Sequence, residues 1–173
     1  MLLEMVEPSL KVIEVLTEQI KELALRIGQI SVQRYPETMR LRQITGIGPI
    51  TALTYVLVIG DKERFAASRD VGAYLGLVPK RDQSGKLEKQ LRISKAGDAY
   101  LRRLLVSAAQ YAIGPFGQPC DLRTHGLKLA ERGGRGAKKK AVIAIARKLA
   151  VVMHTLLMKD CDYEPCRPEK VAA

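Results

Sequence analysis

The sequence predicts a mainly α-helical chain, in which an N-terminal coiled-coil helix precedes a helical domain. Three observations support this. Apolar residues near the N-terminus repeat at alternating spacings of three and four, a glycine turn joins two helical segments, and a long apolar segment with helical periodicity follows near the end. A loop or short β-hairpin carrying Ser84 interrupts the helices. We expect a dimerisation helix over residues 1–35, the domain over 36–160 and a flexible tail over 161–173.

Composition indicates the class of partner. The chain has 173 residues, 47% of them hydrophobic, which is enough for one core. Lysine and arginine number 29 against 18 acidic residues, for a net charge of +11. A surface this positive favours nucleic acid as the partner. Tryptophan is absent and phenylalanine occurs twice, so we expect contacts to DNA phosphate to outweigh base stacking.

The sequence also predicts a soluble, cytoplasmic protein that does not bind membranes. No apolar run approaches the roughly 18 to 20 residues that span a bilayer, and the N-terminus lacks the features of a signal peptide. Cys120, Cys161 and Cys166 are too few and odd in number for a disulfide framework. His125 and His154 do not sit at the spacing of a zinc module, so no metal site is expected in this chain.

Residues 10–30 have the spacing of a heptad seam over about three heptads. Polar and charged side chains occupy most of the other faces, so the apolar stripe is narrow and suits a partner helix. A second copy of the chain is the expected partner. A single amphipathic helix packed on the chain's own core is the alternative. The seam consists of Ile13, Leu16, Ile20, Leu23, Ile27 and Ile30.

Residues 36–61 predict a short helix, a tight turn and a second helix. The turn is Gly46, Ile47 and Gly48, and Pro49 suits the first turn of the following helix. Glycines allow the backbone to turn sharply and its amides to approach a ligand, and the start of a helix attracts anions. The pattern resembles the helix-hairpin-helix motif of DNA-binding proteins without sequence specificity. A plain helix connection, with glycine for steric reasons, is the alternative.

Basic residues outnumber acidic residues by eight to three in residues 80–103. The first part, to about Ile93, lacks helical periodicity and predicts an exposed loop or short β-hairpin that turns at Ser84 and Gly85. A helix follows, for which Ser94 is the expected N-cap, with Asp98 in an acidic first turn. Ser107 lies within that helix. The candidate phosphate contacts are Lys80, Arg81, Lys86, Arg92, Lys95, Arg102 and Arg103.

A long, largely buried helix is predicted from about Ala137 to Met158. Three lysines at a helix start oppose the helix dipole, so helix stability does not account for them, whereas phosphate contact does. A solvated face is the alternative. The basic residues of its first three turns are Lys138, Lys139, Lys140, Arg147 and Lys148, and the first three are candidate DNA contacts.

The order of these segments resembles the C-terminal half of the IS one-ten family of insertion-sequence transposases. The resemblance covers residues 10–160 and rests on the coiled coil, "ITGIGPITALTYVLVIGD", "RFAASRDVGAYLGLVP", "QSGK", "RISKAGDAYLRRLLV" and "KKAVIAIARKLAVVMHTLL". It implies a recombinase that moves a DNA element under the direction of a structured guide RNA. It also implies protomers joined by the coiled coil.

The resemblance implies that Ser84, followed by Gly85, holds the position of a serine that attacks a DNA phosphate. The family's metal-binding DEDD carboxylates belong to an N-terminal RuvC-like domain that this sequence lacks. Asp82 and Gln83 stand where the family usually has an aromatic and acidic pair. On its residues alone, Ser84 is an ordinary turn residue.

We therefore expect a DNA-binding portion of a transposase that is inactive alone and binds no cofactor. Mg²⁺ is expected only together with a carboxylate domain. The alternatives are a non-catalytic helix-hairpin-helix adaptor that dimerises through residues 10–30, and an inactive remnant of a longer reading frame.

Overall fold

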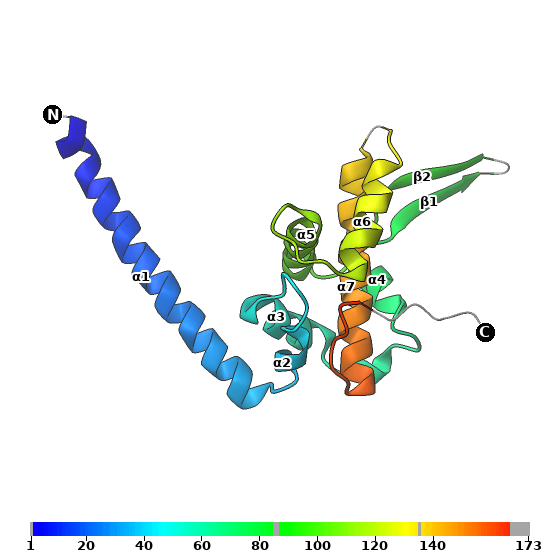
Figure 1. The fold of residues 1–173 in the computed structure, drawn as a ribbon, viewed down its shortest axis with the longest axis horizontal. Helices are drawn as coiled ribbons and strands as arrows, with labels where there is room; N and C mark the ends of the chain where they lie inside the picture. Colours follow the sequence, from blue (N-terminus) through cyan, green and yellow to red (C-terminus); the bar gives the residue numbers. More distant parts are fainter. Residues whose placement is uncertain (1, 85–86, 135, 167–173) are drawn as a thin grey trace.

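The computed structural model describes residues 2–84, 87–134 and 136–166, without the side chains of residues 2–4 and 81–90. Figure 1 shows a helical domain from which one long helix and one hairpin project. The predicted fold class is therefore confirmed. The elements are α1 (Leu2–Arg34), α2 (Thr38–Leu41), α3 (Pro49–Ile59), the 3-10 turn η1 (Lys62–Arg64), α4 (Asp70–Tyr74), β1 (Pro79–Ser84), β2 (Leu87–Ile93), α5 (Ala99–Ile113), α6 (Asp121–Glu131) and α7 (Ala137–Lys159).

Helix α1 extends away from the domain, and its main contacts with it are to α2 and α3 (Figure 1). Its corner with α2 is closed by the buried hydroxyls of Ser31 and Thr38, which lie 2.8 Å apart. Most of the predicted seam is exposed, with Ile13, Leu16 and Ile20 between 55% and 66% accessible. The alternative of an amphipathic helix packed along its length on the chain's own core is therefore wrong.

Helix α7 lies at the centre of the domain, where α4, α5 and α6 pack against it. Its apolar residues, among them Ile145, Leu149 and Met153, are fully buried. The Tyr55 hydroxyl of α3 donates to the Ala150 carbonyl at 2.6 Å and so joins α3 to the same helix. By length and composition α7 could also cross a bilayer, but half of its apolar window is buried inside the domain, as in a core helix.

Residues 161–166, expected as the start of a flexible tail, are bound to the domain. The Gln43 side chain hydrogen-bonds both the Asp162 carboxylate and the Tyr163 amide, at 2.9 and 2.7 Å. The Asp121 amide donates to the Pro165 carbonyl at 2.9 Å. This segment therefore joins the turn after α2 to the start of α6, while residues 167–173 lie outside the described part.

Strands β1 and β2 form an antiparallel hairpin in which Ser84 pairs with Leu87 and Pro79 with Ile93. The hairpin, one of the two predicted alternatives, projects from the helical domain (Figure 1). Its base is a close crossing of two backbone segments, since a Cβ on Gly76 or on Gly97 would overlap backbone atoms of the other segment. Both glycines have positive φ, at 66° and 74°. Only glycine fits such a crossing without strain.

The start of α5 differs from the prediction. Asp98 is the N-cap, because its carboxylate accepts from the Leu101 amide at 2.6 Å. The expected capping role of Ser94 is wrong, since its hydroxyl is buried without a hydrogen-bond partner among the described residues. Ser94 instead takes part in the hairpin base, where its amide donates to the Val78 carbonyl at 2.9 Å.

Candidate nucleic-acid interface

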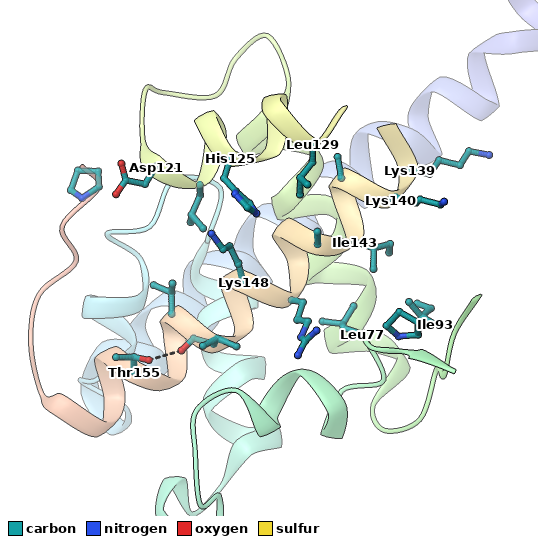
Figure 2. A pocket seen from close by; sticks show the side chains of 18 of the residues that line it. Leu77, Ile93, Asp121, His125, Leu129, Lys139, Lys140, Ile143, Lys148 and Thr155 are labelled. Carbon is teal, nitrogen blue, oxygen red and sulfur yellow. Dashed lines mark hydrogen bonds between the residues drawn. The ribbon is translucent and has the colours of Figure 1, made fainter. Parts of the chain in front are cut away.

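A groove of about 1760 Å³ runs along α7, between the β-hairpin on one side and α6 with residues 161–165 on the other. Figure 2 shows Leu77 and Ile93 at the hairpin side of this groove and His125 and Leu129 on α6. Much of its lining is apolar and includes Leu77, Leu91, Ile93, Leu129, Ile143, Ala144, Val151, Val152 and Leu156.

Basic side chains from separate elements line the same groove. Arg92 belongs to β2, and Lys95 lies just after the end of that strand. Lys139 and Lys140, in the first turn of α7, line the same groove. These four were predicted DNA contacts, and the fold brings them together although about fifty residues separate the two pairs in sequence. The other basic residues that line the groove are His125, Arg132, Arg147, Lys148 and Lys159.

Three of these additional groups, His125, Arg132 and Lys159, were missed by the sequence prediction, and the first two belong together. They share one face of α6 with Asp121 and Leu129, at spacings of three and four residues, and all four line the groove. That periodicity is visible in the sequence. That this face of α6 lines a groove depends on the packing of α6 beside α7, which the sequence does not reveal.

Arg147 is held in the groove by its contact with α4. The backbone of Gly72 lies against this side chain, so that a Cβ at Gly72 would be 2.8 Å from Arg147 Cγ and 3.1 Å from Nε. Glycine at position 72 therefore makes room for the arginine. The packed aliphatic stem restricts the conformations of the Arg147 side chain. Less side-chain entropy is therefore lost when the guanidinium binds an anion.

The predicted contacts outside the groove divide into three groups. Lys80, Arg103 and Lys138 are exposed but do not line it. Arg102 donates to the backbone carbonyls of Leu75 and Ala96, at 3.2 and 2.8 Å, and so fastens the hairpin base to α5. Arg81 and Ser84 have backbone in β1 but side chains outside the described part, and Gly85 and Lys86 lie outside it entirely.

The glycine turn before α3 has two glycines with different surroundings. Gly46 has φ of 90°, and a Cβ there would lie 3.1 Å from the Ala108 carbonyl oxygen of α5. The alternative of glycine for steric reasons thus accounts for Gly46. Gly48, the N-cap of α3, has φ of −88° and nothing within 4 Å of a Cβ. Ile47 between them is buried in the core.

The electrostatics of the groove differ between its two ends. Partial burial, followed by the charges of Lys148, Arg132 and Lys128, lowers the pKa of His125. The opposite end is lined by Asp162, Glu164 and Tyr163 of the C-terminal segment. Burial is also the main cause that raises the pKa of Tyr163 to about 12, so this phenol stays neutral. The cationic part of the groove is therefore the part beside the hairpin and the first turns of α7.

Metal-ligand chemistry has no centre in the described part of the chain, where no three His, Cys, Asp or Glu side chains gather. His154 is fully buried, with its ring nitrogens 3.0 Å from the Ser68 hydroxyl and 2.9 Å from the Lys62 carbonyl. These contacts give His154 a structural role. His125 is the histidine that reaches the groove.

The structure is thus a helical domain with a projecting hairpin and a groove along its central helix that is lined by basic side chains. Residues 38–121, from α2 to the first residue of α6, match the transposase IS116/IS110/IS902 family. The chain belongs to this transposase family. The matched segment includes the glycine turn, the hairpin and α5, while α1 and α7 lie outside it.

Curated relatives extend the similarity over most of the chain. A "Probable family 20 transposase" of Pseudomonas aeruginosa is 33% identical over 157 residues, which are 87% of this chain and 46% of that protein. The "Transposase for insertion sequence element IS1111A" of Coxiella burnetii is 35% identical over 128 residues, 73% of this chain and 34% of the relative. A "Pilin gene-inverting protein" of Moraxella lacunata is 30% identical over 125 residues, 72% and 38% of the two chains. The chain thus spans less than half the length of these relatives.

Proposed function

We propose that this chain is the DNA-binding C-terminal portion of an insertion-sequence transposase, and that the groove along α7 holds the phosphate backbone of a nucleic acid. The observation that carries the proposal is the convergence of Arg92, Lys95, Lys139, Lys140, Arg147 and Lys148 from two separate regions of the chain on one groove. A solvated basic face would not need to collect cations from β2 and α7 around an apolar lining.

Phosphate binding by several cations releases condensed counterions, so affinity falls steeply with salt concentration. Phosphate groups occur at every position of a nucleic acid, so contacts from lysine and arginine to phosphate carry no sequence information. Binding in this groove is therefore expected to depend on the backbone and shape of the nucleic acid more than on its sequence. A structured guide RNA, which the family resemblance implies, carries the same phosphate chemistry.

The proposal is tested by footprinting lysines with an amine-acetylating reagent, read by mass spectrometry, with and without a DNA duplex. We expect DNA to protect Lys139, Lys140 and Lys148 in the groove. Lys11 and Lys21 of α1 are the internal controls and should react equally in both samples, since both side chains are well exposed in ion pairs away from the groove. Equal reactivity of the groove lysines with and without DNA would contradict the proposal.

The glycine turn before α3 forms a second proposed DNA contact, of the helix-hairpin-helix type. The first-turn amides of α3 have no helical partners, because an α-helix leaves its first N–H groups free. Gly48 supports this role, since neither its φ nor its surroundings require glycine for the fold. A ligand backbone that approaches closely would require it.

Ser84 is proposed as the nucleophile position. Its place in the last pair of the hairpin, at the end of a projecting element, would let it reach DNA bound across the basic end of the groove. Attack of Oγ on a phosphodiester would form an Oγ–P bond, break one P–O bond to deoxyribose and transfer the serine proton to a base. The described residues offer no carboxylate cluster for metal, so Mg²⁺ would be supplied with a carboxylate domain.

The chemical proposal has a direct test. Incubated alone with Mg²⁺ and donor DNA, the chain should form no covalent protein–DNA adduct. With a carboxylate domain and guide RNA added, an adduct should form and be lost in Ser84→Ala. An adduct that persists in Ser84→Ala would contradict the nucleophile assignment. Binding without any Ser84-dependent chemistry would support the non-catalytic adaptor or inactive remnant instead.

Oligomerisation is proposed through α1 and a second copy of the chain. Heptad spacing and 55–66% exposure of Ile13, Leu16 and Ile20 both favour a partner helix. Because the main contacts of α1 with its own domain are to α2 and α3, near the C-terminal end of α1, the exposed seam residues over 10–24 stay open for that partner.

A further inference from the structure

His125 and Lys148 approach one another from the two sides of the groove. Figure 2 shows both side chains directed into the space between α6 and α7, with their nitrogen ends toward each other. Lys148 is exposed and His125 is half-buried. The ring of His125 takes part in no hydrogen bond within the described part of the chain, in contrast to His154, whose two ring nitrogens are both engaged.

Three positive charges act on the imidazole of His125. Lys148 comes from α7, Lys128 from α6, and Arg132 directly follows α6. Asp121 also belongs to α6, while Asp162 and Glu164 line the groove from the C-terminal segment. A group of cations around a donor side chain is suited to an anion.

We propose that His125 and Lys148, supported by Arg132, form a binding site for one phosphodiester group of a nucleic acid strand lying in the groove. This inference rests on the proposed DNA-binding function and adds a specific contact to it. The lysine and arginine supply charge, and the imidazole supplies a directed N–H donor from the opposite wall. A strand held here would be fixed between α6 and α7, beyond the basic pairs at the hairpin end.

The site predicts a dependence of affinity on pH. In the free protein partial burial and, after it, the neighbouring cations favour the neutral imidazole. A bound phosphate adds negative charge and favours the imidazolium, so the pKa of His125 is higher in the complex. Binding therefore takes up a proton between the two pKa values. By linkage, affinity is highest below the free pKa, falls as pH rises through this window and levels off above the bound pKa.

The test uses the full chain and two readouts. The first is the NMR titration of the His125 ring proton, free and with a short DNA duplex, with His154 as the internal reference. These are the two histidines of the sequence. We expect DNA to raise the pKa of His125. Inorganic phosphate, at the same concentration of phosphate groups, should produce a much smaller shift if the site recognises a strand.

The second readout is the Kd for the same duplex between pH 5.5 and 8.5. Wild type should lose about tenfold in affinity for each unit by which DNA raises the His125 pKa. His125→Gln should lose this dependence, and Lys11→Gln, outside the groove, should retain it. DNA binding with an unchanged His125 pKa, or with the same pH dependence in His125→Gln, would overturn this site alone. An equal shift from inorganic phosphate would overturn strand recognition, and no DNA binding at any pH would overturn the proposed function as well.

Discussion

The stem of Arg147 lies directly against the backbone of Gly72, with 2.8 Å between Arg147 Cγ and the position that a Cβ of residue 72 would take. One glycine in α4 thus decides where a cation of α7 lies in the groove. Stability and binding can be separated at this position. The neighbour of the missing Cβ is a flexible side chain, which can move away without disturbing the fold.

Gly72→Ala should displace Arg147 and weaken DNA binding. The free energy of unfolding should stay the same or rise, by up to about 1 kcal/mol, because alanine is the better helix former. The salt dependence should lose about one unit of slope, as expected for one phosphate contact. Arg147→Gln is the matched variant. If Gly72→Ala acts through Arg147, adding it to Arg147→Gln should change Kd no further, and additive losses would contradict this coupling.

Gly46 and Gly48 should respond differently to alanine. Gly46→Ala should destabilise the chain by about 1–2 kcal/mol, because φ is positive and the Ala108 carbonyl crowds the new Cβ. Gly48→Ala should leave the thermal midpoint nearly unchanged and weaken DNA binding several-fold. Thermal unfolding and fluorescence anisotropy measure the two effects. Unchanged affinity in Gly48→Ala would reduce the turn to a plain helix connection.

Asp98 and Ser94 form a matched pair at the start of α5. Asp98→Ala should cost about 1 kcal/mol of stability, since it removes the N-cap that accepts from the Leu101 amide. Ser94→Ala should be neutral or stabilising, because its buried hydroxyl has no partner in the described part of the chain. Chemical denaturation distinguishes them. A larger loss in Ser94→Ala than in Asp98→Ala would restore the capping role expected from the sequence.

The exposed seam of α1 should control self-association. Replacing Leu16 and Ile20 by glutamate places charge at the proposed contact between two copies and should yield monomers. Val15→Glu with Leu25→Glu adds the same charge at exposed positions outside the seam and should leave association intact. Analytical ultracentrifugation gives the mass of each variant. Equal masses for both double variants would mean that α1 is not the self-association surface.

Local patterns predicted much of this fold. The N-terminal helix, the glycine turn before Pro49 and the long last helix all follow from spacing along the chain, and each is present. The hairpin was predicted as one of two possibilities. The predicted N-cap of α5 was wrong, because the Ser94 amide hydrogen-bonds to the Val78 carbonyl at the hairpin base. The spacing of residues along the chain does not encode this contact between two segments.

The groove was only partly predictable for the same reason. Arg92, Lys95, Lys139 and Lys140 could be identified as candidate contacts from local charge, but not as neighbours of one groove. Arg102 was expected to bind phosphate, yet it donates to carbonyls of Leu75 and Ala96. Whether an arginine binds phosphate or a backbone carbonyl depends on which carbonyls the tertiary fold leaves without a hydrogen-bond partner. The placement of residues 161–166 could not be predicted from local sequence either, because they hydrogen-bond to Gln43, which is distant in the sequence.

The central claim is that the groove along α7 binds nucleic acid through phosphate. It is tested most directly by the slope of log Kd against log salt concentration, for wild type and for a variant with Lys139, Lys140, Arg147 and Lys148 changed to glutamine. Each phosphate contact contributes about 0.9 to this slope for duplex DNA. The account predicts a steep wild-type slope that falls by roughly three to four units in the variant, while the thermal midpoint is retained. An unchanged slope and Kd in a folded variant would contradict it.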